Sequence, residues 1–446
     1  MKKYFGTDGI RGVANEYLTP ELSYRLGRVL GLRIRYGYVK EPYVYVGKDT
    51  RMSCDLLEYS IICGFLSVGV NVKRLHVIPT PGVAYLTAST EASMGVMISA
   101  SHNPFYDNGI KLFSSNGMKL SDEEELEIEE LLDNDDSKGR SINENVGIVL
   151  NRHESMYQYI ESLFFSVKNR FDGLKIGLDC ANGATFNIVN RLFTRLGAEV
   201  TIINDNPDGM NINDKCGATD LKDIRNLVLL ENLDIGFAFD GDGDRVMAID
   251  ELGNIIDGDF ILYIMGKYFK DNSSLSNNNI VTTTMSNMGL YKALERIDIT
   301  STQTDVGDRY VLKEMLDKGY NLGGEQSGHV IMLDYNTCGD GMLVALQLTS
   351  IVKESGLTIS EMVKDMKKYP QLLGKVKVTD KEEIMNNKNF LEVIEKCDSE
   401  LGDEGRVLVR PSGTEPVIRI MVEAKDELLC QKYYDEVYNT LNNIIN

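Results

Sequence analysis

Three stretches of the chain repeat one plan: an apolar, β-branched run, a turn of small residues, an amphipathic helix and a second apolar run. The plan spans residues 43–78, 175–203 and 280–303, with helices expected at 54–68, 184–196 and 287–296. Strand–helix–strand units of this size need right-handed crossovers and give buried, largely parallel strands. Three such units at domain-scale spacing predict three related α/β domains in series.

The end of the chain follows a different pattern. It predicts a strand at 374–379, a helix at 381–396, strands at 405–409 and 417–424, and a helix at 426–443. This order indicates a small α+β domain and not a fourth copy of the repeat. The predicted fold class is therefore α/β: three related α/β domains with mixed, largely parallel sheets, plus a smaller C-terminal α+β domain. A chain of 446 residues is long enough for several such cores.

Composition marks the boundaries between these domains. A capping box at 121–124 opens an acidic helix that runs into a polar linker at 133–139. A helix with apolar residues at helical spacing is predicted from 151 to about 170. Residues 252–254 predict a hairpin turn, and Pro370 is expected to end a helix. The predicted domains are 1–150, 151–252, 253–369 and 370–446.

The charge balance excludes some classes of partner. The net charge is −20, with 67 acidic against 47 basic residues. Nucleic acid and anionic membrane surfaces are bound by excess Lys and Arg, so neither is expected as a partner. A small anionic substrate stays open, because a basic pocket can lie within an acidic protein. Residues 121–136 alone hold ten Asp or Glu, which predicts a solvated helix remote from any cleft.

The sequence also predicts a cytoplasmic protein. It has no run of 18 or more apolar residues, and Gly6 and Asp8 interrupt the N-terminus before a signal-peptide core could form. The seven cysteines are scattered and include no C-x-x-C pair. An odd, dispersed set of this kind is typical of reduced thiols in the cytoplasm.

The strongest candidate for chemistry is the run Asp240-Gly241-Asp242-Gly243-Asp244-Arg245, which lies between two apolar stretches. Alternating glycines let a loop turn tightly, so that three carboxylates converge on one point. Their repulsion favours a cation, and oxygen ligands select Mg²⁺ or Ca²⁺. An EF-hand would place Glu251 at its twelfth position, but Arg245 stands where the sixth position needs Gly. A solvated acidic turn is the remaining alternative.

A second candidate loop, Ser99-Ala100-Ser101-His102-Asn103-Pro104, follows the apolar strand 95–98. A serine at the end of a buried strand is well placed as a nucleophile. No G-x-S-x-G elbow or Ser-His-Asp triad accompanies it, so a simple Ser/Asn turn is an equal alternative. The chain continues to Lys111, which is predicted to lie on the far strand of a hairpin.

A third loop, Arg410-Pro411-Ser412-Gly413-Thr414-Glu415-Pro416, is followed by Arg419. Two hydroxyls, a glycine backbone and an arginine on each side form a candidate phosphate cradle. The G-K-[ST] of a Walker loop is missing, so nucleotide binding is not implied. A proline-punctuated hairpin loop is the alternative explanation.

Two further loops combine glycine with polar side chains. Glu325, Ser327 and His329 occupy every second position of residues 323–329, which suits hydrogen bonding to vicinal sugar hydroxyls. Residues 5–12 place Arg11 in a glycine-framed loop near the N-terminus. Each of these two loops is equally explained as a simple turn when it is considered alone.

Taken together, these five loops closely resemble the motifs of the α-D-phosphohexomutase superfamily, in family order and spacing along the whole chain. That superfamily has three related α/β domains and a smaller C-terminal one around a central cleft, which agrees with the architecture predicted above. Gln326 and the run Thr304 to Tyr310 resemble the glucosamine branch of the superfamily. The resemblance implies a small sugar phosphate as the partner, a cytoplasmic location and a homodimer.

The resemblance also implies a role for each motif. Ser101 would be the phosphorylated residue, and one Mg²⁺ per chain would be bound by a phosphoserine oxygen with Asp240, Asp242 and Asp244. The groups around the reacting phosphate would be Arg11, His102, Lys111 and Arg245. Sugar hydroxyls would be held by Glu325 and Ser327, with His329 beside them. The non-reacting phosphate would be held by Arg410, Ser412, Gly413, Thr414 and Arg419.

The implied reaction is the interconversion of glucosamine 6-phosphate and glucosamine 1-phosphate, with glucosamine 1,6-bisphosphate as the intermediate and activator. The phosphoglucomutase/phosphomannomutase branch is the first alternative. A non-catalytic sugar-phosphate sensor is a remote one, because such a protein is expected to lose Ser101 or one of the three aspartates. A sugar kinase has no Walker or kinase motif to support it.

Overall fold

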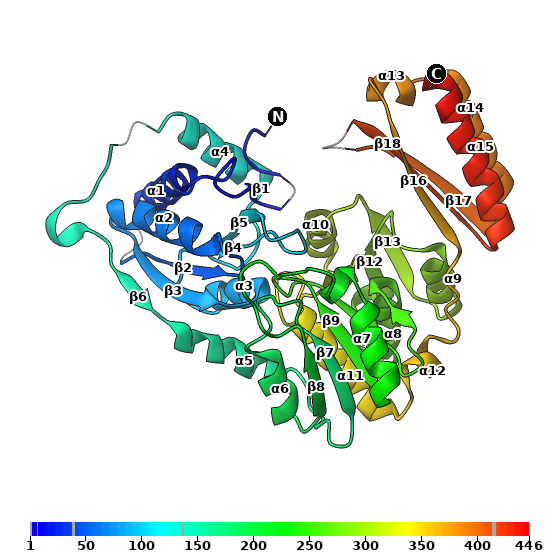
Figure 1. The fold of residues 1–446 in the computed structure, drawn as a ribbon, viewed down its shortest axis with the longest axis horizontal. Helices are drawn as coiled ribbons and strands as arrows, with labels where there is room; N and C mark the ends of the chain where they lie inside the picture. The colour runs from blue at the N-terminus through cyan, green and yellow to red at the C-terminus, as the bar shows by residue number, and fades with distance from the viewer. Residues whose placement is uncertain (1, 7, 38–40, 136–137, 413–415, 446) are drawn as a thin grey trace. The chain divides into compact units, whose positions relative to one another are not determined.

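The computed structural model describes residues 2–6, 8–37, 41–135, 138–412 and 416–445. Its contacts divide the chain into two compact units. The first unit comprises Met1–Met285 and Ile299–Lys364, and the second comprises Ser286–Asp298 and Asp365–Asn446. Figure 1 shows the chain from its blue N-terminal part to its red C-terminal helix.

The first sheet has six strands in the order β1-β5-β4-β2-β3-β6. Their bounds are β1 Ile10–Val13, β2 Tyr43–Lys48, β3 Asn71–Val77, β4 Met94–Ile98, β5 Asp107–Ser114 and β6 Val149–Asn151. Strand β2 runs parallel to β3 and β4, whereas β4 and β5 form an antiparallel hairpin. The helices that follow are α1 Pro20–Tyr36, α2 Cys54–Ser67, α3 Thr80–Ala88 and α4 Asp122–Asp133. Helices α1, α2 and α4 share one core with the sheet (Figure 1).

The second sheet has the order β11-β10-β9-β7-β8. Its strands are β7 Lys175–Asp179, β8 Glu199–Ile203, β9 Ile235–Phe239, β10 Val246–Ile249 and β11 Ile255–Ile256. Strand β7 is parallel to β8 and β9, and β9 turns into an antiparallel β10. The helices of this part are α5 Met156–Phe165, α6 Val189–Arg195 and α7 Lys222–Glu231.

The third sheet has the order β13-β12-β14-β15. Its strands are β12 Asn279–Thr283, β13 Thr300–Thr304, β14 Leu322–Gly324 and β15 Val330–Met332, and the pair β14/β15 is antiparallel. Its helices are α8 Gly258–Asp271, α10 Asp308–Lys318, α11 Gly341–Ser355 and α12 Ile359–Val363. Helix α11 is buried from Gly341 to Val352, because it packs against α8 on one side and against strands β9 and β10 on the other.

The second unit is built on an antiparallel sheet of β16 Gln371–Lys377, β17 Gly405–Pro411 and β18 Val417–Ala424, in the order β16-β18-β17. Its helices are α9 Met288–Arg296, α13 Lys381–Met385, α14 Lys388–Leu401 and α15 Glu427–Ile445. Residues of α14 and α15 form a common core with the sheet. Helix α9 belongs to this unit although it lies between β12 and β13 in sequence.

The predicted fold class is confirmed: the first three sheets are mixed and mostly parallel, and a smaller antiparallel domain ends the chain. Three details were wrong. The helix predicted at 184–196 begins only at Val189, and the helix predicted at 381–396 is two helices, because Asn387 caps the start of α14. Pro370 ends no helix, since α12 stops at Val363 and Pro370 immediately precedes β16. The predicted bounds of the four domains stay a prediction.

Three of the four chemical motifs of the first unit lie in hairpins between antiparallel strands, whereas Arg11 of the N-terminal motif lies on β1. The serine loop joins β4 to β5, the aspartate loop joins β9 to β10, and residues 325–329 join β14 to β15. In the part of the chain that the structure describes, no helix has the length and apolar character needed to cross a membrane.

Candidate active site

Ser101 follows the buried strand β4 and is itself 1% exposed. Its φ angle of 52° lies in the left-handed region, which is uncommon for a residue with a side chain. The Ser101 Oγ donates a hydrogen bond to Asp240 Oδ2 at 2.5 Å and lies 3.3 Å from His102 Nδ1. The serine hydroxyl therefore points at the aspartate loop of the second sheet.

Asp240, Asp242 and Asp244 are buried in the turn between β9 and β10. One carboxylate oxygen from each of the three lies within 4.8 Å of the other two. Gly243 has φ +71°, and a Cβ on Gly241 would lie 2.6 Å from the carbonyl oxygen of Ser101. The glycines thus permit the turn and the close approach of the two loops. The alternative of a solvated acidic turn is wrong, and strands flank the loop where an EF-hand would have helices.

The aspartate triad fits a divalent cation. Among the described residues, Asp242 Oδ1 and Asp244 Oδ1 are buried without a hydrogen-bond partner. Burial, together with the Asp244 and Asp242 charges, raises the pKa of Asp240 well above its usual range. Unpartnered buried carboxylate oxygens are strongly unfavourable, and a hard cation such as Mg²⁺ satisfies them.

Two cations of the first sheet reach this triad or its neighbourhood. Lys111, on β5, is 1% exposed, and its Nζ lies 2.7 Å from Asp242 Oδ2 and 3.0 Å from Asp244 Oδ2. Burial opposes its charge, but Asp242, Asp244 and Asp8 raise the pKa of Lys111 well above its usual value. Arg11, on β1, pairs with Asp8. Both side chains are therefore positively charged beside the triad.

Arg245 and His102 complete the surroundings of Ser101. The Arg245 backbone N–H donates to Asp240 Oδ1 at 3.2 Å, and its side chain lies 3.9 Å from Asp244 Oδ1. Burial and the charges of Arg245 and Arg11 lower the pKa of His102 to about 4. His102 is therefore a neutral imidazole at pH 7, able to accept a proton.

A closed ring of alternating acidic and basic side chains joins the loops of all three sheets. It runs from Asp244 to Lys111, to Asp8, to Lys119, to Asp308, to His329 and back to Asp244. The His329 nitrogens lie 3.7 Å from Asp244 Oδ1 and 3.5 Å from Asp308 Oδ2. Burial lowers the pKa of His329, but the negative charges of Asp244 and Asp308 outweigh burial and raise it. The ring fixes the metal loop, the serine hairpin and the loop of His329 relative to one another.

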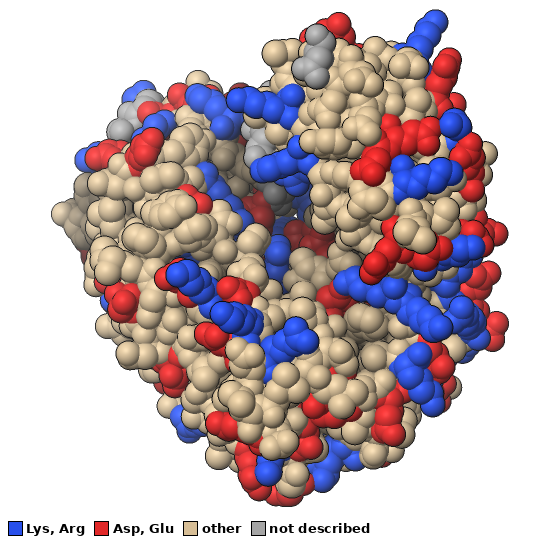
Figure 2. Space-filling view, turned by 45° about the vertical axis from the view of Figure 1, so that its right-hand side comes forward, with Lys and Arg blue, Asp and Glu red and all other residues tan. Residues whose placement is uncertain are grey.

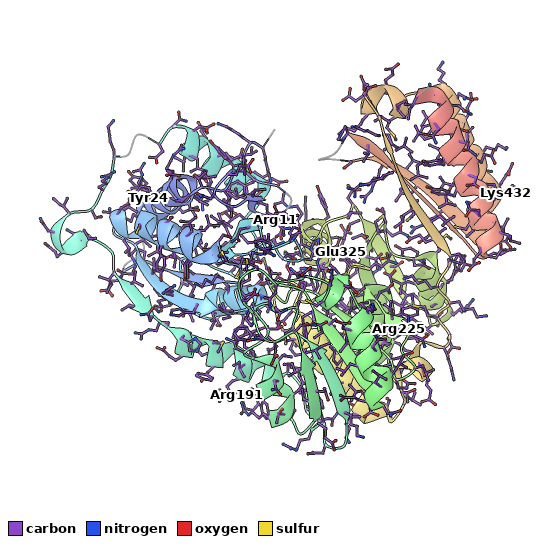
Figure 3. The ribbon with its side chains drawn as sticks, in the orientation of Figure 1. Arg11, Tyr24, Arg191, Arg225, Glu325 and Lys432 are labelled. Atoms are coloured by element: carbon purple, nitrogen blue, oxygen red, sulfur yellow. The ribbon has the colours of Figure 1, made fainter. Side chains whose placement is uncertain are left out.

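The hairpin between β14 and β15 presents Glu325, Ser327 and His329. Glu325 Oε1 accepts a hydrogen bond from the backbone N–H of Gly307 at 3.1 Å. Among the described residues, the Ser327 Oγ is buried without a partner. Figure 3 shows Arg11 and Glu325 towards the middle of the first unit, whereas Arg191 lies at its periphery. The hydroxyl therefore has an unused hydrogen-bonding capacity that a polar ligand would satisfy.

The predicted phosphate cradle lies in the second unit. Arg410 on β17 and Arg419 on β18 are cross-strand partners, so both side chains leave the same face of the sheet. Like charges opposite each other are unfavourable unless an anion or another partner offsets them. Ser412 is buried at the end of β17, and the predicted residues Gly413 and Thr414 lie outside the described residues.

The acidic helix α4 is not simply solvated, as the composition had indicated. Glu125 and Glu129 are 4% and 6% exposed. Glu129 accepts hydrogen bonds from the backbone N–H groups of residues 3–5, and Glu125 accepts two from Arg309, the neighbour of Asp308. On the face in Figure 2, acidic and basic side chains are interspersed. The helix therefore anchors the N-terminal motif and the start of α10.

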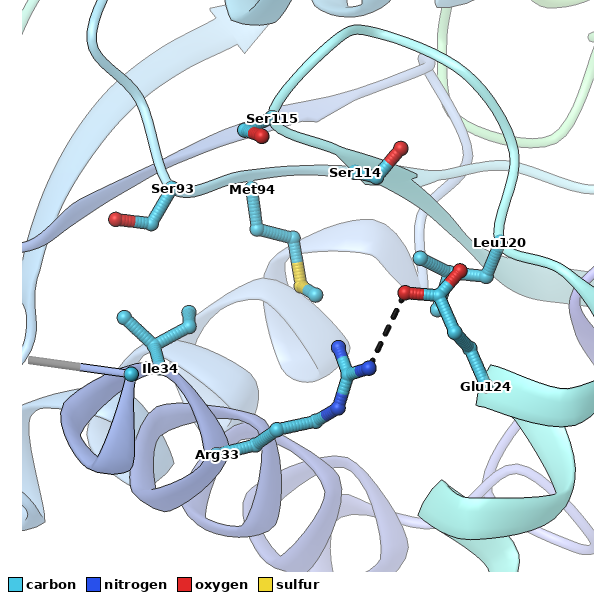
Figure 4. Close-up of a pocket in the computed structure, with 9 residues that line it drawn as sticks. Arg33, Ile34, Ser93, Met94, Ser114, Ser115, Leu120 and Glu124 are labelled. Atoms are coloured by element: carbon cyan, nitrogen blue, oxygen red, sulfur yellow. Dashed lines mark hydrogen bonds and ion pairs between the residues drawn. The ribbon is translucent and has the colours of Figure 1, made fainter. Parts of the chain in front are cut away.

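A cavity of about 400 Å³ lies at the other end of the serine hairpin (Figure 4). Arg33 and Glu124 pair across it at 3.1 Å, and Ser93 and Ser114 line its far side. Ser93 precedes β4 and Ser114 ends β5, whereas Ser101 lies at the opposite ends of the same strands. This cavity is therefore separate from the aspartate triad.

Several site residues were missed by the sequence analysis. Asp8, Lys119 and Asp308 close the ring of charges, and Thr80 donates to Asp242 Oδ2 from the first turn of α3. Arg51 holds the serine loop. Asp8 and Asp308 lie within the runs 5–12 and 304–310, which the sequence singled out for other reasons. Thr80 and Arg51 follow strand ends, where polar residues of parallel strands gather, and Lys119 has no such signal.

Four family profiles match the chain almost from end to end. They describe the phosphoglucomutase/phosphomannomutase alpha/beta/alpha domains I, II and III at residues 2–139, 156–253 and 257–369, and the C-terminal domain of the same proteins at residues 373–440. The chain belongs to the phosphoglucomutase/phosphomannomutase family.

Among its relatives are phosphoglucosamine mutases. That of Bacillus cytotoxicus is 52% identical over 442 residues, which cover 99% of this chain and 98% of the relative. That of Brevibacillus brevis is 53% identical over 428 residues, 96% of each chain. A solved phosphoglucomutase/phosphomannomutase family protein of Burkholderia thailandensis has the same fold, with a TM-score of 0.81 at 22% identity over 99% of this chain and 98% of that one.

Proposed function

We propose that the chain is a phosphoglucosamine mutase, which interconverts glucosamine 6-phosphate and glucosamine 1-phosphate through a phosphoserine enzyme. The observation that carries the proposal is the contact of the Ser101 Oγ with Asp240 at 2.5 Å, inside a triad with unpartnered oxygens. About half of the residues are identical to those of curated phosphoglucosamine mutases over almost the whole chain, which supports the choice of sugar.

The first half-reaction moves a phosphoryl group from Ser101 to the sugar. The bond between phosphorus and Ser101 Oγ breaks while O1 of glucosamine 6-phosphate forms a new bond to phosphorus, giving the 1,6-bisphosphate. The proton that leaves the O1 hydroxyl is balanced by the proton that Ser101 Oγ takes up, and neutral His102 at 3.3 Å is placed to exchange it. Lys111, Arg11 and Arg245 offset the charge of the moving group.

The second half-reaction reverses the direction of transfer. The bisphosphate turns over in the site, Ser101 takes the 6-phosphoryl group, and glucosamine 1-phosphate leaves. Sugar hydroxyls are held by Glu325 and Ser327, with His329 beside them. The phosphate that is not reacting is held by Arg410, Ser412, Gly413, Thr414 and Arg419, so this cradle recognises phosphate at either end of the sugar.

Asp240, Asp242 and Asp244, with an oxygen of phosphorylated Ser101, are proposed to hold one Mg²⁺. When bound, Mg²⁺ supplies charge neutralisation at the phosphoryl oxygens. The buried carboxylate oxygens that lack partners support this assignment. The seven cysteines, all among the described residues, are free thiols, which supports a cytoplasmic location.

The test is a mutase assay without ATP on glucosamine 6-phosphate, glucose 1-phosphate and mannose 1-phosphate, with the bisphosphate as activator. The highest kcat/KM is expected for glucosamine 6-phosphate, and a preference for mannose 1-phosphate would overturn the proposed substrate. Ser101→Ala should abolish turnover and the added phosphate mass. Ser115→Ala, at an exposed serine beyond the far end of β5, is the matched control. Near-native turnover of Ser101→Ala would refute the phosphoserine mechanism.

A further inference from the structure

Arg51 lies beneath the serine loop with its side chain fully buried. It follows β2, and its guanidinium donates hydrogen bonds to four backbone carbonyl groups of that loop. The acceptors are Ser101 O at 2.8 Å, Asn103 O at 2.9 Å, Asp107 O at 3.0 Å, and Pro104 O. A single side chain therefore holds the loop on both sides of its proline.

Asp49 fixes the orientation of that guanidinium and also reaches the serine itself. Its Oδ2 accepts from Arg51 Nε at 2.8 Å and from Ser99 Oγ at 2.6 Å. The Ser99 Oγ in turn accepts from the backbone N–H of Ser101 at 2.9 Å. Asp49 thus connects Arg51 to both the amide and the carbonyl of the residue that carries the reacting hydroxyl.

Asn213, in the segment between β8 and α7, holds the same serine loop. The Asn213 side-chain amide donates to Ser101 O at 2.9 Å and to Asn103 O at 3.1 Å, the same two oxygens that one Arg51 nitrogen binds. Both lone pairs of these carbonyl groups are then occupied. The loop is consequently fixed at Ser101, where the backbone adopts its left-handed conformation.

Stability alone is a weak explanation of this arrangement. A left-handed non-glycine residue costs about 1–3 kcal/mol, and strain of this kind is typical of functional sites held by their surroundings. A buried ion pair such as Asp49–Arg51 adds little net stability compared with apolar residues. What the contacts do achieve is a fixed direction for the Ser101 Oγ, at 2.5 Å from Asp240.

We propose that Arg51 is a positioning residue for phosphoryl transfer: it holds the serine loop so that the Ser101 oxygen stays in line with the sugar hydroxyl. This inference rests on the proposed function. Without the guanidinium contacts of Arg51, the loop still carries Ser101 and the aspartate triad is unchanged. The Ser101 Oγ, however, is no longer held in one direction. Transfer to the sugar then slows, and water reaches the phosphoserine more often.

The experiment follows labelled phosphoryl groups on Ser101 after rapid mixing with saturating glucosamine 6-phosphate. Enzyme labelled from the bisphosphate is quenched over time, and label on sugar is separated from inorganic phosphate. In Arg51→Lys the charge stays but the planar fork is lost. Transfer is expected to slow about 10-fold or more, because small misplacement of a reacting group costs up to about 10²-fold. Because attack by water is not slowed, the ratio of hydrolysis to transfer is expected to rise by the same factor, about 10-fold or more.

This ratio does not depend on how much of the protein is folded, so it separates positioning from a general loss of stability. Arg74→Lys is the matched control, since Arg74 makes a two-pronged pair with Glu58 at 2.7 and 2.6 Å and touches no residue of the loop in the contacts described. It should lower thermal stability and leave the ratio unchanged. Ser99→Ala removes one hydroxyl from the same network and should shift the ratio in the same direction by a smaller factor.

The outcomes separate the two proposals. Absence of transfer to glucosamine 6-phosphate in the wild-type enzyme would overturn the proposed function. Transfer in the wild type with an unchanged ratio in Arg51→Lys would overturn the positioning role alone, whether or not both rates fell together. If Arg51→Lys does not fold, Ser99→Ala decides, and an unchanged ratio there overturns the positioning role.

Discussion

Removal of Lys119 tests the ring of charges most directly. Its Nζ bridges Asp8 and Asp308, which are 17% and 13% exposed at their side chains, and Lys119 itself is 12% exposed. Breaking a buried ion pair by removing one partner costs about 3–5 kcal/mol, and the residual exposure puts Lys119→Met at the lower end, about 3 kcal/mol. The Tm shift per kcal/mol decreases with size and is about 2 °C near 250 residues, so in this larger unit Tm should fall by roughly 4 °C.

Activity should fall with stability, for a reason that the ring itself supplies. Without Lys119, Asp8 is expected to draw closer to Lys111 and Arg11, and Asp308 is expected to draw closer to His329, its remaining partner. A loss of about 10-fold in kcat is expected from this displacement. The unfolding transition is followed by circular dichroism, because the chain has no tryptophan.

Two comparisons make the result specific. Lys2→Met also removes a cation between two carboxylates, Asp122 and Glu125, but lies outside the ring, so kcat should be unchanged. Adding Asp308→Asn to Lys119→Met should cost less than Asp308→Asn alone, with a coupling of about 1–3 kcal/mol. Unchanged Tm and kcat in Lys119→Met would refute the ring, and additive effects would refute the coupling.

Three further outcomes can be measured. Thr80→Val removes the hydroxyl that orients Asp242, so the affinity for Mn²⁺ should weaken about 10-fold when it is measured by electron paramagnetic resonance. Thr80→Ser should restore this affinity, and equal affinities in the two variants would contradict the role of the hydroxyl. Mg²⁺ at 100 times its Kd should stabilise the enzyme by about 2.7 kcal/mol, and Asp244→Asn should largely remove that gain in a thermal melt. Burial raises the pKa of Asp340 to about 6, against hydrogen bonds from Leu343, Tyr159 and Asn336. Because that folded-state pKa exceeds the unfolded value of 3.8, stability should fall as pH rises from about 4 to 6, by about 3 kcal/mol. Asp340→Asn should flatten this slope in urea titrations, and an identical slope would refute the assignment.

The order of strands and helices was predictable because it depends on local pattern. Apolar runs, caps and turn residues located the strand–helix–strand units and the small last domain. The placement of α9 was not predictable, because the sequence pattern of a helix between two strands does not indicate which sheet the helix packs against. Its N-terminal residue Asn287 donates to the buried Glu423 of β18, so a contact 136 residues away assigns it to the second unit.

The residues of the candidate site also divide into those that local sequence locates and those that only distant contacts bring in. Motifs that are contiguous in sequence, such as the serine loop and the aspartate loop, could be located before the structure was known. Lys119 could not, because it is an ordinary charged residue whose partner, Asp308, lies 189 positions away. Composition also misjudged α4: a run of acids predicts solvation, but Glu129 is buried because three consecutive backbone N–H groups converge on it.

The antiparallel hairpins explain why so few segments suffice to build the site. In a purely parallel sheet, each strand end contributes one loop, and the chain then leaves through a helix. Here β4 returns at once as β5, so the segment that carries Ser101 also brings back Lys111, paired with Met97 in the same hairpin. The turn from β9 to β10 likewise delivers three carboxylates and Arg245 within six residues. The aspartate turn keeps an excess of negative charge, and Lys111 of the first sheet offsets part of it. A rigid hairpin then needs only distant anchors, such as Arg51 and Lys119, to fix its direction.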